Sequence, residues 1–293
     1  MLAPALNVDE RGRLFDFSAQ WPLLLGLLTL AIPTFLALAE QHWATEAGAH
    51  APLVLVTGGW MIYRKLHETE VPPQPGRGYK VALLLVPSLV LYVFGRAYDY
   101  LIFEAVGLYG AAIATAYRLW GGKLLRELSF PIFFLAFAIP LPGWLLDQTT
   151  APLKQFASTI TTGVLQWAGV PIVREGVTLY VAQYQLLVED ACAGMNAIVG
   201  LTSLGLFYAY MMRGTSWRYC LLLMLFVLPI AVLANVIRII VLVLITLYAG
   251  DEAAQGFLHG TAGLVLFASA LLLVMGLDSV LWPFFRRRGR AHA

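Results

Sequence analysis

Charged residues are scarce in this chain, and that scarcity excludes a soluble domain. Asp, Glu, Lys and Arg make up 12% of the 293 residues and hydrophobic residues 60%, whereas soluble proteins carry about 25% charged residues. So few charges cannot cover the apolar surface, and the hydrophobic residues fall in long blocks that suit membrane spans. The composition predicts a polytopic membrane protein whose surroundings are the lipid bilayer.

Cysteine is almost absent, which excludes a disulfide framework. The chain has only Cys192 and Cys220, so each needs its own explanation. A structural zinc site takes three or four Cys or His ligands, and only Cys192 and His259 are available together. We therefore expect no metal and no cofactor, and the net charge of +2 gives no sign of a nucleic-acid partner.

Hydropathy predicts an all-α bundle of about eight transmembrane helices in a single integral membrane domain over residues 1–293. The run before Glu40 ends in Ala37-Leu38-Ala39, a pattern of signal-peptide cleavage, but it is long for a signal peptide and is assigned as a span. The span over 51–63 is short and could be tilted or re-entrant. The predicted spans are Trp21–Ala39, Ala51–Tyr63, Val81–Gly95, Tyr100–Tyr117, Leu128–Leu146, Ala191–Met211, Tyr219–Tyr248 and Thr261–Pro283.

The basic residues predict the orientation of this bundle. With both termini in the cytoplasm, fifteen of the nineteen Lys and Arg residues fall on the cytoplasmic side, as the positive-inside rule requires. Arg96, Lys154 and Arg174 fall outside, and Arg238 falls within a span. We expect Arg174 and Lys154 to be solvated charges, although they could meet an acidic substrate residue.

The longest outer segment covers about residues 147–190. From Thr149 to Val170, apolar residues recur at helical spacing, which predicts an amphipathic helix along the outer membrane surface. Pro171 to Val188 alternates, with Val177, Leu179 and Val181 on one face, and this predicts extended structure or a small hairpin. The segment leads directly into the residues that carry the candidate chemistry, at about 190–260.

Arg238 is the strongest single signal in the sequence. An arginine near the middle of a span costs about 2.5–3.5 kcal/mol on insertion and is usually functional or paired. Asn235 lies one turn earlier on the same helical face. The alternative is a structural salt bridge, for which Glu104 in the fourth predicted span is the candidate partner.

Cys192 lies at the outer start of a predicted span, with Asp190 as a possible N-cap and Asn196 one turn deeper. A helix N-terminus lowers the pKa of a thiol, whereas the carboxylates of Glu189 and Asp190 raise it. The sequence leaves the resting ionisation of Cys192 open. Cys220 falls at the cytoplasmic side and is predicted to be a packing residue.

His259 lies at the outer start of the last predicted span, at the level of Cys192. Arg238 lies about 15 Å below the outer end of its span, and its long side chain can extend toward that face. Such a trio supports acyl transfer: His259 as general base and acid, Cys192 as nucleophile, and Arg238 as the group that stabilises the oxyanion or holds the substrate.

At these residues the sequence resembles the exosortase/archaeosortase family. The matching motifs are Asp190-Ala191-Cys192-Ala193-Gly194, Asn235-Val236-Ile237-Arg238 and His259-Gly260. The resemblance implies a membrane cysteine transpeptidase or protease, in a bacterial inner membrane, with its active site toward the outer face. Its substrates would be exported proteins with a C-terminal signal: a short Pro-Glu-Pro-like motif, a hydrophobic span and a basic tail.

Two other readings compete with this one. A transporter or export-complex subunit could use Arg238, Asn235 and Glu104 as a polar intramembrane path, and it predicts that Cys192 is dispensable. A membrane acyltransferase could use His259 without the thiol. The sequence leaves open the oligomeric state, the exact recognition motif, and whether water or another nucleophile resolves the thioester.

Overall fold

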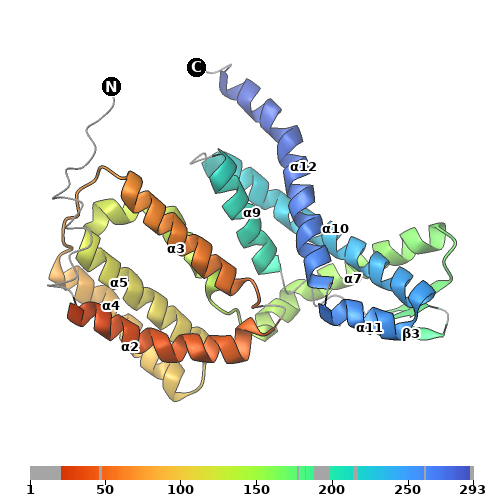
Figure 1. The fold of residues 1–293 in the computed structure, drawn as a ribbon, viewed down its shortest axis with the longest axis horizontal. Coiled ribbons are helices and arrows are strands. Elements are labelled where there is room, and N and C mark those ends of the chain that lie inside the picture. Colours follow the sequence, from red (N-terminus) through yellow and green to blue (C-terminus); the bar gives the residue numbers. More distant parts are fainter. Residues whose placement is uncertain are drawn as a thin grey trace. The chain divides into compact units, whose positions relative to one another are not determined.

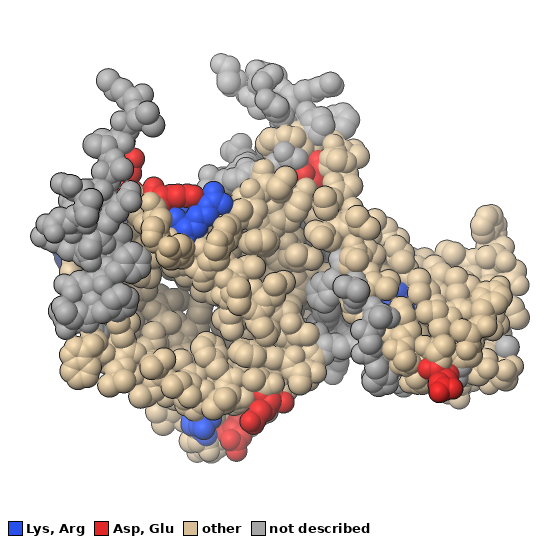
Figure 2. All heavy atoms as spheres, in the orientation of Figure 1, with Lys and Arg blue, Asp and Glu red and all other residues tan. Residues whose placement is uncertain are grey.

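The computed structural model describes residues 21–45, 48–176, 178–181, 183–187, 198–213, 217–260 and 262–290. The chain divides into two compact units, Met1–Pro142 and Gly143–Ala293, which are described separately. Both units are mostly helical (Figure 1). On the face shown in Figure 2, the charged side chains of the described residues form only small groups, as expected for a protein surrounded by lipid.

The first unit is built from helices only, within the residues described. Helix α4 packs along α5, and α2 also packs on α5, while α3 packs on α6 and the 3-10 turn that follows it. The elements are α2 (Trp21–Leu38), the π-helix η1 (Ala39–Trp43), α3 (Ala51–Glu68), α4 (Gly78–Ala97), α5 (Leu101–Glu127), α6 (Ser129–Leu135) and the 3-10 helix η2 (Ala136–Ala138).

The predicted span Leu128–Leu146 is not one helix, and this part of the prediction is wrong. Helix α6 ends at Leu135, and after η2 the chain is non-helical from Ile139 to Pro142. Pro140 and Pro142 explain the break, because proline lacks an N–H and disfavours helical backbone in the residue before it. Side chains contact two backbone carbonyls before the break: the Tyr109 hydroxyl donates to the Ile132 oxygen of α6 at 2.6 Å, and Nε2 of His50 lies 3.0 Å from the Phe137 oxygen of η2.

One end of the first unit gathers all of its described Lys and Arg residues except Arg96. The backbone N–H groups of Gln74 and Gly76, in the loop between α3 and α4, donate to the Trp120 and Arg118 carbonyls near the end of α5. The end of α3, the start of α4 and the end of α5 therefore meet. The basic residues in these segments are Arg64, Lys65, Arg77, Lys80, Arg118, Lys123 and Arg126.

The second unit combines helices with a small sheet. The predicted amphipathic helix is present as α7, and the predicted extended segment is a three-stranded antiparallel meander in the order β1-β2-β3. The elements are α7 (Gly143–Trp167), β1 (Ile172–Glu175), β2 (Thr178–Val181), β3 (Tyr184–Leu187), α9 (Ile198–Arg213), α10 (Trp217–Ala249), α11 (Asp251–Gly260) and α12 (Ala262–Arg290).

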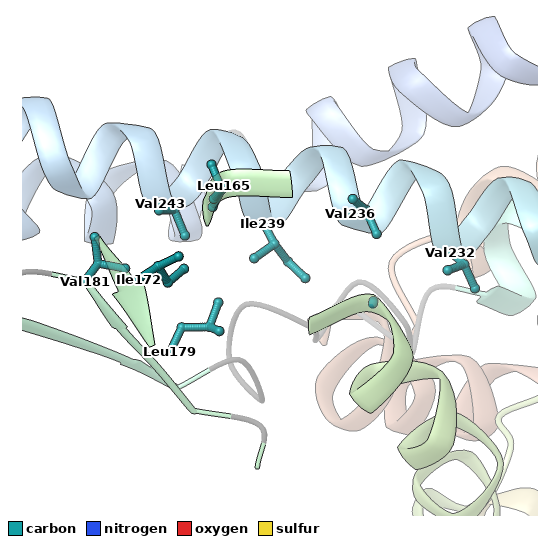
Figure 3. Close-up of a cluster of buried hydrophobic side chains, with 9 residues drawn as sticks. Leu165, Ile172, Leu179, Val181, Val232, Val236, Ile239 and Val243 are labelled. Atoms are coloured by element: carbon teal, nitrogen blue, oxygen red, sulfur yellow. The ribbon is translucent and has the colours of Figure 1, made fainter. Parts of the chain in front are cut away.

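Helix α10 organises this unit, because α7, α9, α11 and α12 all pack on it. On one side, a core cluster joins the sheet and α7 to α10 (Figure 3). Leu179 and Val181 of β2 are buried there, as predicted for one face of an extended segment, whereas Val177 lies outside the described residues. The buried residues of this cluster are Ala157, Leu165, Ile172, Leu179, Val181, Val232, Val236, Ile239 and Val243.

Three helices are long and apolar enough to cross a membrane, within the part of the chain described: Trp21–Trp43, Gly78–Ala97 and Pro229–Ala249. Shorter apolar helices cover Ser129–Ala138, Val199–Met212 and Ala268–Trp282. The mostly helical transmembrane class is confirmed, and the count of about eight spans stays a prediction.

Candidate functional site

Arg238 is completely buried within the second unit. Its exposed fraction is 0%, as is that of Asn235 one turn earlier on α10, and each side chain has an interaction partner. A guanidinium inside an apolar helix is costly and is retained where it serves a function or a charge pair. The sequence-based expectation that both groups point inward is therefore confirmed.

Two packing clusters bracket Arg238 along α10. One turn before it, Ala234 packs with Ala231 and with residues of α9 and α12. One turn after it, Leu242 packs with Ala254 of α11. Because residues four apart share one side of a helix, Arg238 lies on the side of α10 that faces α9, α11 and α12. The residues of the first cluster are Leu201, Ala231, Ala234, Leu266 and Ala270.

A glycine turn folds α11 back along α10 (Figure 1). Gly250 has φ +86°, a left-handed conformation that ends helices and that glycine adopts without strain. Ala254 and Phe257 then pack on Leu242 and Ile245 of α10. Arg238 lies twelve residues before Gly250 and His259 nine residues after it, so the rise of 1.5 Å per residue puts their backbones within about 5 Å in level.

The first turns of α9 and α12 lie at the same level along α10 as Arg238. Leu201 and Leu266 pack beside Ala231 and Ala234, whereas Ala209, Leu277 and Leu281 pack near Leu222, at the other end of α10. Both helices thus run opposite to α10. Ile198 and Ala262, their first described residues, lie one turn further toward Arg238.

The other predicted site residues are only partly described. Cys192, Asp190 and Asn196 lie outside the described residues, and for His259 the backbone is described as part of the last turn of α11 while its side chain is not. Cys192 precedes Ile198 by six residues in the sequence. The structure therefore brings three helix ends to the level of Arg238, and the catalytic roles remain predictions.

Helix α11 is not predicted by the hydropathy pattern. The sequence predicted that α10 leads through a short connection into the last span, with His259 at its mouth. Helix α11 runs for ten residues from Asp251 to Gly260, directly after Gly250, and glycines at both ends are the signal that could have revealed a separate short helix.

Lys154 is buried, so the interpretation of it as a solvated outer charge is wrong. Only 8% of this residue is exposed, because it lies on the same side of α7 as Ala157 and Leu165, which pack on α10. Arg174 behaves as expected: it is exposed, and its Nη1 donates to the Gly176 carbonyl at 2.9 Å.

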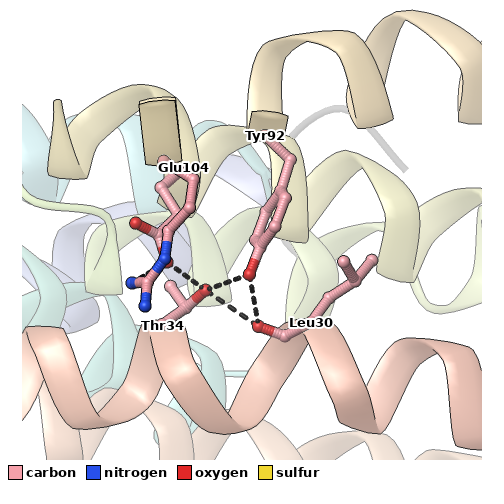
Figure 4. Close-up of polar contacts among 5 residues, drawn as sticks. Leu30, Thr34, Tyr92 and Glu104 are labelled. Atoms are coloured by element: carbon pink, nitrogen blue, oxygen red, sulfur yellow. Dashed lines mark hydrogen bonds and ion pairs between the residues drawn. The ribbon is translucent and has the colours of Figure 1, made fainter. Parts of the chain in front are cut away.

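Glu104 has its own partners within the first unit (Figure 4). It is 3% exposed, its Oε1 accepts a hydrogen bond of 2.8 Å from the Thr34 hydroxyl, and Nη1 of Arg96 lies 3.4 Å away. The Tyr92 hydroxyl donates to the Leu30 carbonyl beside them at 3.0 Å. This network, which joins α2, α4 and α5, accounts for a buried carboxylate without an ion pair to Arg238.

No three His, Cys, Asp or Glu side chains come together among the described residues in a way that could hold a metal ion. The described polar side chains at the level of Arg238 include its own guanidinium and the amide of Asn235.

The model of the transmembrane exosortase family (Exosortase_EpsH) matches residues 42–276, which is most of the chain. This chain belongs to the transmembrane exosortase family. The membership confirms the resemblance seen in the three short motifs, all of which fall inside the matched range, and it makes the protein a multi-pass transmembrane protein. No curated protein and no solved structure gives a significant match.

Exosortase membership implies a transpeptidase or protease role and the processing of exported proteins that carry C-terminal sorting signals of the PEP-CTERM type. The matched range begins at His42 and includes the site-bearing helices α9, α10 and α11 completely.

Proposed function

We propose that this exosortase is a cysteine transpeptidase or protease that cleaves the sorting signal of exported proteins through a thioester on Cys192. The observation that carries the proposal is the convergence of three helix ends at the level of a fully buried arginine. One end carries His259, and another follows Cys192 by six residues. An extended chain of that length reaches up to about 20 Å, which leaves the thiol free to approach Arg238.

The proposed reaction uses one proton carrier and one charge stabiliser. His259 takes the proton of the Cys192 thiol, and the sulfur attacks the carbonyl carbon of the scissile peptide bond. Arg238 stabilises the oxyanion of the tetrahedral intermediate. When the C–N bond breaks, His259 returns the proton to the leaving amine and a thioester remains. Water or an amine then attacks the thioester, releases the product and restores the thiol.

The proposed setting is a bacterial inner membrane with both termini in the cytoplasm and the site toward the outer face. The gathering of seven basic residues at one end of the first unit supports this orientation, because cytoplasmic segments are enriched in Lys and Arg. The substrate signal would lie in the same bilayer, with its own basic tail on the cytoplasmic side.

The test co-expresses the protein with an exported protein from the same genome that ends in a short motif, a hydrophobic span and a basic tail. Processing is followed by the loss of the C-terminal segment on gels. Cys192→Ala should abolish it, and Arg238→Ala and His259→Ala should each lower its rate by about 100-fold or more. Cys220→Ala is the matched cysteine control and should leave the rate unchanged.

Persistence of processing in Cys192→Ala would overturn the thiol mechanism. It would also favour the competing reading of a polar path through Arg238 and Asn235, for which the cysteine is dispensable. Equal expression of all variants in the membrane fraction is required for the comparison.

A further inference from the structure

The small sheet of the second unit has two edges, and they differ in how they are covered. At the β1 edge, α7 packs on the strand, and Nε2 of Gln166 donates to the Ile172 carbonyl at 2.9 Å. Strand β3 pairs with β2 on one side. On its other side, no residue that the structure describes pairs with it.

A strand edge that no described residue covers is a ready site for another strand. Alternate residues of β3 direct their N–H and C=O groups away from β2, which leaves a row of donors and acceptors with which a further strand can pair. Natural proteins usually cover or distort exposed edges unless the edge binds something.

The sheet is held firmly enough to act as a platform. Its inner face is fixed on α10 through Ile172, Leu179 and Val181, which are at most 3% exposed (Figure 3). On the opposite face, Val173, Tyr180 and Gln185 form one row across the three strands. A peptide added at β3 would therefore meet a preformed edge and need to order only itself.

We propose that the outer edge of β3 binds the substrate in an extended conformation, by adding it as a fourth strand next to the segment that leads to Cys192. Strand β3 ends at Leu187, five residues before Cys192, a stretch of at most about 18 Å. This inference rests on the proposed function, because the proposed function supplies the peptide that binds at the edge. That peptide is the segment of the exported protein around the cleaved bond.

Extended binding suits both the chemistry and the proposed signal. A helical substrate keeps its carbonyls in internal hydrogen bonds, whereas a strand presents alternate carbonyls to the enzyme. In a motif with two prolines separated by one residue, both ring nitrogens lie on the same edge of the strand. They can face away from β3, while the residue between them makes the backbone hydrogen bonds.

Cross-linking tests the geometry directly. Gln185→Cys is introduced into a chain that also carries Cys192→Ala and Cys220→Ala, and the co-expressed substrate carries one cysteine at successive positions around its motif. Because side chains on one face of a strand recur every second residue, disulfide formation should alternate along the substrate with a period of two. Val173→Cys, in the same row but on the covered β1 edge, should give no substrate adduct.

Three outcomes would overturn the proposal. A period of three to four residues would mean that the substrate binds as a helix. Absence of any adduct would mean that the edge is not a binding site. A disulfide between two copies of Gln185→Cys without substrate would mean that the edge pairs with a second copy of this chain.

A backbone substitution gives an independent readout. Gln185→Pro removes an N–H from the β3 edge and should slow processing by about tenfold or more. Val173→Pro controls for general damage to the sheet and should have the smaller effect. If Cys192-dependent processing continues unchanged in Gln185→Pro, the edge proposal fails while the proposed function stands.

Discussion

At the scale of single residues, the buried charges of this protein show how a membrane helix can carry them. Glu104 is held by a hydroxyl from one helix and a guanidinium from another, and Arg96 extends from this contact toward the surface with about half of its side chain exposed. Arg238 instead lies wholly inside the second unit. The contacts of Glu104 lie within the first unit and stabilise its fold, whereas Arg238 lies beside three helix ends of the second unit, the position from which we propose that it acts in the reaction.

Replacing the buried carboxylate should therefore weaken the first unit. Glu104→Gln keeps an acceptor for Thr34 but removes the charge that attracts Arg96, and we expect it to lower stability by about 1–2 kcal/mol. The measurement is the midpoint of thermal unfolding in detergent. Glu68→Gln is the matched control, because Glu68 pairs with Arg64 at 2.6 Å at the surface, and such exposed pairs contribute less than about 1 kcal/mol. A midpoint of Glu104→Gln at or above that of the control would contradict the prediction.

At the scale of elements, glycine decides where two helices change direction. Gly250 turns α11 back along α10, and Gly121 kinks α5. Gly121 has φ +76°, and a Cβ there would collide with the carbonyl oxygen of Gln74, in the loop that joins α3 to α4. The kink thus makes room for the loop that gathers the basic residues at one end of the first unit.

Gly121→Ala should destabilise the first unit by more than about 1 kcal/mol, because it combines an unfavourable backbone conformation with that collision. Gly122→Ala is the adjacent control: its Cβ would meet nothing closer than Tyr117 Cε2 at 3.5 Å, an ordinary contact. Stability is compared by thermal unfolding in detergent. Equal midpoints for the two variants would show that the kink is not required.

The packing of α11 on α10 should set the position of His259 and hence the rate of processing. Ala254→Leu adds bulk against Leu242 and should push α11 away, at a cost of about 1–3 kcal/mol. Leu242→Ala leaves a cavity at the same contact. The double variant restores the total volume and should recover much of the activity lost in Ala254→Leu.

The measurement is the rate of substrate processing together with the amount of protein in the membrane. The same exchange of volume at Leu266 and Ala270, between α12 and its neighbours, controls for general repacking. If the double Leu242→Ala and Ala254→Leu variant is no better than the sum of its parts, the two residues do not act through one contact.

At the scale of the whole molecule, orientation in the membrane is the property on which function depends. The opposite ends of α4 allow a matched test, because Tyr79 and Tyr98 are equally exposed, at 63% and 64%. Each is replaced by cysteine in a chain with Cys192→Ser and Cys220→Ser. A membrane-impermeant maleimide should label Tyr98→Cys in cells whose outer membrane is permeabilised, and Tyr79→Cys only after the inner membrane is opened. The reverse pattern would invert the proposed orientation.

Much of this protein could be predicted from local patterns. The scarcity of charge required a membrane protein, and the apolar runs predicted seven of the helices, although α5 runs ten residues and α12 seven residues beyond the predicted span. Alternation predicted extended structure or a small hairpin with Leu179 and Val181 on one face, and both residues are buried. Arg238 was recognisable because a charge in an apolar helix is costly wherever that helix packs. Each of these signals can be seen within a short stretch of sequence, because it reflects the hydrogen bonding and burial of residues that are close together along the chain.

Tertiary packing decided the rest. Whether Lys154 is solvated depends on which side of α7 meets α10. The return of α11 along α10 brings His259 to the level of Arg238, and it depends on contacts between residues that are 9 to 15 positions apart. The sequence by itself determined which residues are chemically able to form a site. Only the tertiary structure decided which helix ends lie at the level of Arg238, because packing between elements, and not position along the chain, sets the distances in space.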